Sequence, residues 1–296
     1  MVKTRTPPIL SLSFRLISDR QRAWAQRNSV RVDRRCRVAE LAENLFQDLR
    51  PETRKEYQDA DGNELEDKFS ALYSSAAIVC NVFDYWRARP ERVGACFEMS
   101  AATGMGFERK HSLFDDLISG YSSDPLRRVP NIDVELNGQR GSDNLVIECK
   151  FTEPFVKYEE THRPFTSTYF RSEAEPIWAG LSSTRELATQ INRGLGIFER
   201  LDATQLIKTG LACQRRFGPG CWRFVYLWYE VTHSGHMTEE CGVLTAELTR
   251  FRELTHGELP VSGMTWQELF NRIEAVADPN DSRYTAYLRD RYFEHA

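Results

Sequence analysis

The run Leu145-Val146-Ile147-Glu148-Cys149-Lys150-Phe151 holds two charged side chains inside an otherwise apolar stretch. A short apolar run of this kind indicates a buried strand, in which residues two apart share a face. Glu148 and Lys150 should therefore point one way, and Ile147, Cys149 and Phe151 the other way, toward a core. The chain must fold so that one face of this strand is buried while a carboxylate and an ammonium stay together on the opposite face.

A second strand is expected just before this one. Residues 131–136 place Ile132, Val134 and Leu136 at alternate positions, and Asn137-Gly138 opens the connection to the run at 144–151. Asn-Gly between two apolar runs favours a hairpin, so the two strands should be antiparallel. Asp133 would then lie near Glu148 and Lys150. Such a group of two acids and a base suits a hard divalent cation with a water beside it, although an ordinary ion pair on an edge strand has the same residues.

The composition excludes several classes of protein. Of 296 residues, 41% are hydrophobic and 28% charged, as in an ordinary globular protein. No apolar run approaches the roughly 20 residues of a membrane-spanning helix, and the N-terminus lacks the apolar core of a secretory signal, so we expect a cytoplasmic protein. The seven cysteines include no close pair and are expected to be reduced. His233 and His236 lack a third ligand for zinc.

The charge is unevenly distributed along the chain. Residues 1–55 hold 13 Lys and Arg against 6 Asp and Glu, although the whole chain has a net charge of −4. This basic segment could contact phosphates, or it could be a solvated face that balances an acidic body. The segment 154–180 is irregular and aromatic; its rings could stack on unpaired bases or pack as a covering flap.

Hydrophobic periodicity and turn signals predict alternating helices and strands. Helices are expected at about 18–28, 33–49, 64–87, 183–201, 237–254 and 265–276, with a short one ending near Tyr292, and strands at 104–111, 131–136, 144–151 and 223–231. The strand at 223–231 is apolar on both faces and should be central in its sheet.

This order of elements, together with two motifs, resembles the PD-(D/E)XK nuclease superfamily. The motifs are Pro130-Asn131-Ile132-Asp133 and Glu148-Cys149-Lys150, with two residues between the proline and the aspartate. The wider context of Ser74-Ser75-Ala76, Asn81-Val82-Phe83 and Gln190-Ile191-Asn192-Arg193 is similar to bacterial restriction-endonuclease-like proteins. The resemblance covers about residues 64–231. It implies an α/β fold in which a mixed sheet flanked by helices forms a core at 64–235, with a basic helical extension at 1–63 and a helical extension at 236–296.

The resemblance also implies a chemistry. Asp133, Glu148 and the Cys149 backbone carbonyl would bind Mg²⁺ or Mn²⁺, and Lys150 would orient or help deprotonate the attacking water. Gln190, from the following helix, would position Lys150 or the water. An upstream acid would complete the site; Glu108 is the first candidate, followed by Glu66 and Glu98.

The function expected on these grounds is metal-dependent hydrolysis of phosphodiester bonds in DNA. Cleavage of both strands would favour a homodimer. The alternatives are a nucleic-acid-binding or interaction module without turnover, or another metal-dependent reaction on the same fold.

Overall fold

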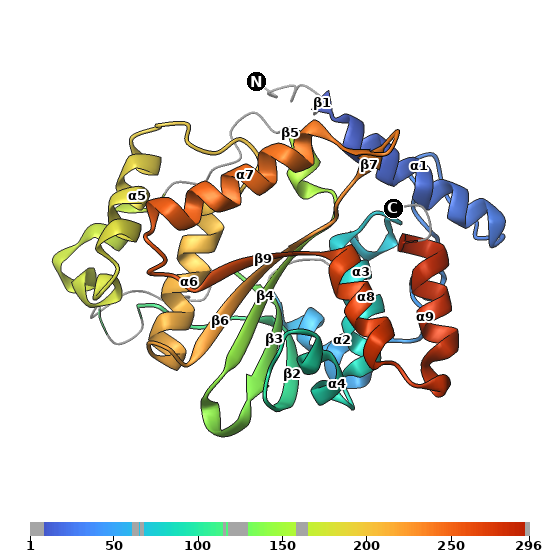
Figure 1. The fold of residues 1–296 in the computed structure, drawn as a ribbon, viewed down its shortest axis with the longest axis horizontal. Coiled ribbons are helices and arrows are strands. Elements are labelled where there is room, and N and C mark those ends of the chain that lie inside the picture. The colour runs from blue at the N-terminus through green and yellow to red at the C-terminus, as the bar shows by residue number, and fades with distance from the viewer. Residues whose placement is uncertain are drawn as a thin grey trace.

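The computed structural model describes residues 9–60, 65, 68–114, 117, 130–157 and 165–293. A five-stranded sheet runs through the middle of the molecule with helices on both faces, which confirms the predicted α/β architecture (Figure 1). No helix in these ranges is long and apolar enough to cross a membrane.

The sheet has the strand order β2-β3-β4-β6-β9. β2 (Ala102–Arg109), β3 (Ile132–Gly138) and β4 (Asn144–Lys150) are antiparallel, whereas β6 (Trp222–Trp228) and β9 (Val261–Thr265) continue the sheet in parallel with β4. The sheet is therefore mixed, and the predicted hairpin and the central position of β6 are confirmed.

β9 is a strand that sequence reasoning missed. It lies within the segment 236–296, which was expected to be helical and instead supplies an edge of the sheet. Only five residues long, β9 shows no alternation of apolar and polar residues. A Cβ at Gly263 would lie 2.5 Å from a Leu248 methyl group and 2.8 Å from the Trp228 ring, so the close packing of this edge depends on a glycine.

The N-terminal third is less helical than its apolar spacing predicts. α1 (Leu12–Arg27) confirms a helix there, beginning at the Ser11 cap. The helix expected at 33–49 is wrong. The Asp33 carboxylate accepts the N–H groups of Arg35 and Arg37 and closes a turn, which leaves only a 3₁₀ turn at Leu41–Asn44. α2 (Pro51–Asp59) then starts at its proline.

The long helix expected at 64–87 is likewise wrong. The described part of that range holds a 3₁₀ turn at Lys68–Ser70, then α3 (Ser75–Phe83) and a second 3₁₀ turn at Asp84–Trp86, followed by α4 (Pro90–Cys96). The Ser74 hydroxyl accepts the Ala77 N–H at 3.3 Å and so starts a new helix within the range that was expected to be one helix.

The second half of the chain supplies most of the remaining helices. The helix expected at 183–201 ends early, because α5 (Ser182–Asn192) stops before Gly194, whose φ of 73° is left-handed. α6 (Ala203–Phe217), which was not predicted, follows behind an Asp202 cap. α7 (Glu239–Leu254) and α8 (Trp266–Val276) confirm their predictions. The chain continues with α9 (Ser282–Leu288) and a π-helical turn at Arg289–Phe293.

Two hydrophobic clusters fill the two sides of the sheet. One joins α3, α8 and α9 to Ile147, Cys149 and Phe151, as the strand parity predicted, and the other joins α5, α6 and α7 to Val146 and Tyr226. Phe165, Tyr169 and Trp178 are buried in the second cluster, so the described part of the aromatic segment packs as a cover. Short pairs of strands complete the fold: β1 (Ile9–Leu10) with β5 (Val156–Lys157), and β7 (Thr232–His233) with β8 (His236–Met237).

Candidate active site

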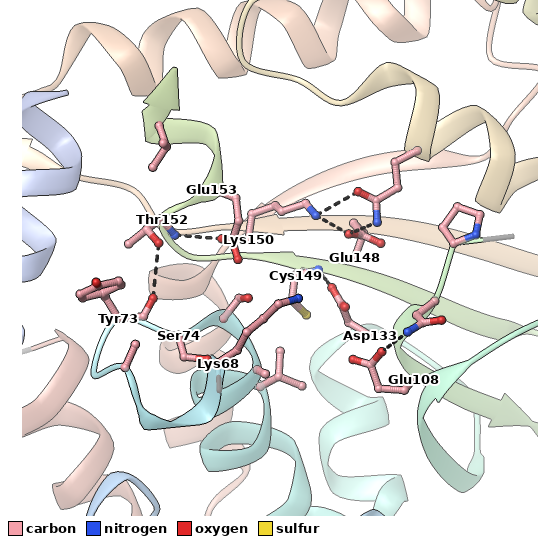
Figure 2. Close-up of a pocket in the computed structure, with 18 of the residues that line it drawn as sticks. Lys68, Tyr73, Ser74, Glu108, Asp133, Glu148, Cys149, Lys150, Thr152 and Glu153 are labelled. Carbon is pink, nitrogen blue, oxygen red and sulfur yellow. Dashed lines mark hydrogen bonds and ion pairs between the residues drawn. The ribbon is translucent and has the colours of Figure 1, made fainter. Parts of the chain in front are cut away.

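The predicted acids and lysine meet at one end of the sheet. A cavity of about 790 Å³ opens there between the ends of β3 and β4, the start of α3 and the first turn of α6. Its lining includes Glu108, Asp133, Glu148, Cys149, Lys150, Glu153, Lys68, Ser74, Ser75 and Gln205. Figure 2 shows the charged side chains of both walls directed into this space.

The divergence of two strands brings Asp133 to the site. The β3–β4 ladder ends at the pair Val134 and Ile147. Beyond it, the Asp133 carboxylate of β3, in place of a backbone carbonyl, accepts the backbone N–H of Cys149 at 2.6 Å. The N–H and C=O of one strand residue face the same neighbour, so the Cys149 carbonyl faces this gap as well.

Glu148 and Lys150 form a hydrogen-bonded triangle with Gln205. Lys150 Nζ donates to Glu148 Oε1 at 2.5 Å and to Gln205 Oε1 at 3.1 Å. Gln205 Nε2 donates to the same Glu148 oxygen at 2.7 Å. Each of the three side chains is therefore fixed by the other two, on the strand face that the sequence assigned to Glu148 and Lys150.

Burial and charge shift the protonation of this group in opposite directions. Burial raises the pKa of Asp133 well above its ordinary value, and the neighbouring Glu148 carboxylate adds to the effect. Burial also raises the pKa of Glu148, against the opposing charge of Lys150. Burial lowers the pKa of the Lys150 ammonium, but the two carboxylates outweigh burial and hold that pKa well above its usual range. Lys150 is therefore a cation near neutral pH.

One oxygen of Glu148 has no hydrogen bond in the described structure. The side chain is only 2% exposed, its Oε1 takes two donors, and its Oε2 is buried without a partner. A buried carboxylate oxygen left in this state is costly unless a cation binds it. Together with Asp133 and the Cys149 carbonyl, it offers the all-oxygen ligand set that Mg²⁺ and Mn²⁺ prefer, so these residues fit such an ion.

The protein ligands at this site are few. Within the described ranges, no three His, Cys, Asp or Glu side chains gather at metal-binding distance. Mg²⁺ usually keeps several waters and takes only one or two protein carboxylates, so two acids and a carbonyl are sufficient ligands for one ion.

Glu108 lies at the rim of the same cavity, near the end of β2. Its backbone has a φ of 51°, a left-handed conformation that residues with a Cβ seldom adopt, and its Oε2 accepts the Asn131 amide at 2.6 Å. Glu98 does not line the cavity; its side chain is 79% exposed and lies 3.4 Å from Arg272. Glu66 lies outside the described residues.

The structure does not bring Gln190 to the site. Gln190 lies on α5, where its amide donates to Glu186 at 3.2 Å and borders a separate pocket with His256 and Leu254. Gln205, on the next helix, lies where we predicted Gln190 to lie, in contact with Lys150. The signal for α6 was present, since an Asp202 cap precedes apolar residues at 206, 207 and 211, but no helix was expected between residue 201 and the strand at 223–231.

Glu153 is a further acid that sequence reasoning did not assign. It follows β4, and its Oε2 accepts the N–H groups of Phe151 at 2.9 Å and Thr152 at 3.0 Å. The carboxylate thereby fixes the chain just after Lys150 and contributes negative charge to the cavity.

The comparison with protein families agrees with this architecture. The family model described as "Restriction Endonuclease associating with ARP" matches residues 21–293, which span the whole sheet and both cavity walls. No curated protein and no solved structure matches the chain. The restriction-endonuclease-like resemblance and fold are thereby confirmed, and the match indicates a nuclease-like protein. The chain belongs to the family of restriction endonucleases associating with ARP.

Proposed function

We propose that the protein is a metal-dependent endonuclease that hydrolyses phosphodiester bonds in DNA. The observation that supports this most strongly is Glu148: Lys150 and Gln205 hold one of its oxygens, the other is buried without a partner, and Asp133 lines the same cavity. Stability alone favours a buried ion pair in which both carboxylate oxygens are hydrogen-bonded.

Asp133, Glu148 and the Cys149 carbonyl would hold Mg²⁺ or Mn²⁺. When bound, such an ion would acidify a water and neutralise charge that develops on the phosphate. The raised pKa values of Asp133 and Glu148 support this assignment, because they indicate a site in which added positive charge is favourable.

We assign Lys150 to orienting the attacking water and stabilising phosphate charge. Its high pKa makes it a poor proton acceptor, so of the two roles predicted for it the structure favours the orienting one. Gln205 keeps the ammonium beside Glu148, and it replaces Gln190 in the proposed mechanism. A duplex cut in both strands would require two such sites, so a homodimer is the proposed active form.

The test is cleavage of supercoiled plasmid and linear duplex DNA with Mg²⁺, with Mn²⁺ and with a chelator. Cleavage should require the metal and should disappear in Asp133→Ala, Glu148→Gln and Lys150→Ala, while Gln190→Ala should cleave like the parent. Metal-independent cleavage, or full activity in the Lys150 variant, contradicts the proposal. A non-catalytic binding module is distinguished by Mn²⁺ titration, since it would show no cation affinity that depends on Asp133.

A further inference from the structure

We propose that Lys68 binds a phosphate of the nucleic-acid backbone from the cavity wall that faces Asp133 and Glu148. The proposal deepens the function above and rests on it for the identity of the substrate. Lys68 belongs to the 3₁₀ turn that precedes α3, so it comes from a part of the chain remote from the metal-binding strands.

Lys68 and the proposed metal ligands line one cavity. The lining includes Lys68, Ser74 and Ser75 from the α3 side, and Asp133, Glu148 and Lys150 from the sheet. Figure 2 shows the Lys68 side chain extending from the α3 wall toward the strand that carries Cys149. A chain of phosphates lying along the cavity would therefore pass between an acidic wall and a wall that presents an ammonium.

The negative charge of the cavity is the reason that a polyanion would need a cation such as Lys68. Glu108, Asp133, Glu148 and Glu153 all line it, and Lys150 is the cation that β4 contributes to the lining. A polyanion entering such a site is repelled unless other cations contact its phosphates. Among the described lining residues, the other cationic side chains are Lys68 and Arg37, and both lie on the α3 side.

The start of α3 adds to the positive character of this wall. Ser75 and Ala76, the first residues of the nine-residue helix, line the cavity. The first N–H groups of a helix have no partner within it and favour an anion. The Ser74 hydroxyl accepts the N–H of Ala77. Glu148, whose Oε2 has no hydrogen-bond partner in the described structure, lines the same cavity, so the proposed cation and the phosphate bound by Lys68 would share one space.

The backbone around Lys68 is anchored, which fixes the base of its side chain. Phe69 is fully buried, and its carbonyl accepts the Asn44 amide. The same amide donates to the Ala71 carbonyl at 2.9 Å, and Arg37 donates to the Ser70 hydroxyl at 3.0 Å. Lys68 is thus an exposed, long side chain on a rigid turn, a suitable arrangement for contacting a phosphate as a point charge.

The salt dependence of duplex binding tests the proposal. Binding of a fluorescent duplex oligonucleotide is measured by anisotropy in chelator, over a series of low salt concentrations, so that no metal or turnover is needed. Lys68→Ala should lower the slope of log affinity against log salt by about 1, the signature of one lost phosphate contact, and Lys68→Arg should keep the parent slope. The control is Lys55→Ala, since Lys55 is an exposed lysine on α2 that pairs with Asp59.

The outcomes separate this proposal from the proposed function. Parental affinity and slope in Lys68→Ala, in a variant whose melting curve matches the parent, overturn the Lys68 proposal even if the parent cleaves DNA. If Lys68→Ala loses one unit of slope but the parent does not cleave DNA in Mg²⁺, the phosphate contact of Lys68 is supported and the proposed nuclease function is overturned. A parent that binds no duplex at low salt overturns the Lys68 proposal outright.

Discussion

Gln205 and Glu148 are joined by a hydrogen bond of 2.7 Å, although 57 residues separate them in the sequence. The same glutamine accepts from Lys150, so one amide on α6 orients both a proposed metal ligand and the proposed water-orienting cation. Side chains that orient ligands in this way affect metal affinity and activity without touching the metal themselves.

Gln205→Ala should therefore lower cleavage or Mn²⁺ affinity by about 10- to 100-fold, the range usual for such partners. Gln190→Ala is a matched control, because it removes the same side chain from the neighbouring helix. Mn²⁺ titration and initial cleavage rates measure the effect. A loss only in Gln190→Ala would show that α5 rather than α6 serves the site, and equal losses would contradict the specific role of Gln205.

Glu108→Gln should reduce cleavage while leaving stability nearly unchanged. The substitution keeps the shape of the side chain and an oxygen for Asn131, but removes a negative charge from the cavity rim. A residue with a Cβ kept at a φ of 51° beside a site indicates a position held for function.

The matched control for Glu108→Gln is Glu98→Gln. Glu98 also has a left-handed backbone, with φ of 59°, but it lies away from the cavity. Cleavage rates at several Mn²⁺ concentrations, with melting temperatures alongside, separate the two. If Glu108→Gln cleaves as fast as Glu98→Gln at every metal concentration, Glu108 is not part of the site.

Local patterns were sufficient to predict the strands that carry the site. The alternation in Leu145–Phe151 and the Asn-Gly turn are encoded within a few residues, so the faces of Glu148 and Cys149 and the antiparallel pairing of β3 and β4 followed from the sequence. Asp133 followed from the same hairpin. These predictions needed no knowledge of distant contacts.

The parts that were missed depend on tertiary packing. The apolar spacing that predicted one helix at 64–87 does not show that a new helix starts behind Ser74, and α3 itself is buried on nearly every side. Which helix crosses the end of β4 is likewise decided by packing over the sheet, so a glutamine at 190 and one at 205 are equally plausible from sequence alone. β9 was too short for periodicity to register.

Glu135 on β3 should make the free energy of unfolding depend on pH in the acid range. Burial alone would raise the pKa of Glu135, but the hydrogen bond from His111 at 2.6 Å and the Asn137 amide lower it below its ordinary value of 4.5. A carboxyl with a lowered pKa in the folded state stabilises that state above its unfolded pKa, and the stabilisation is lost as the pH falls through the folded pKa.

Urea unfolding of the parent and of Glu135→Gln checks this expectation between neutral pH and the onset of acid unfolding. The parent should be the more stable protein near neutrality, and the difference should shrink as the pH falls below about 4.5. A difference that stays constant with pH would mean that the ionised form of Glu135 contributes nothing to stability.

The last turn of the chain holds the N-terminal helix through a buried cation. Arg291 is 3% exposed, and its guanidinium donates to the Asn44 carbonyl at 2.9 Å and to Gln21 on α1 at 3.2 Å. The Trp24 ring lies 4.2 Å from the guanidinium carbon. These contacts join α1, the turn at Leu41–Asn44 and the π-helical turn, which are far apart in sequence.

Arg291→Met should destabilise the fold by about 3 kcal/mol, because the carbonyl and amide oxygens that it serves would stay buried without donors. Arg289→Met, two residues earlier in the same turn, is the matched control: Arg289 is 48% exposed and pairs with Glu274, so its loss should cost no more than about 1 kcal/mol. Urea unfolding midpoints measure both. Similar costs for the two variants would show that Arg291 does not secure the N-terminal helix, whereas a large cost for Arg291→Met alone would establish this contact as the link between the chain's two terminal regions.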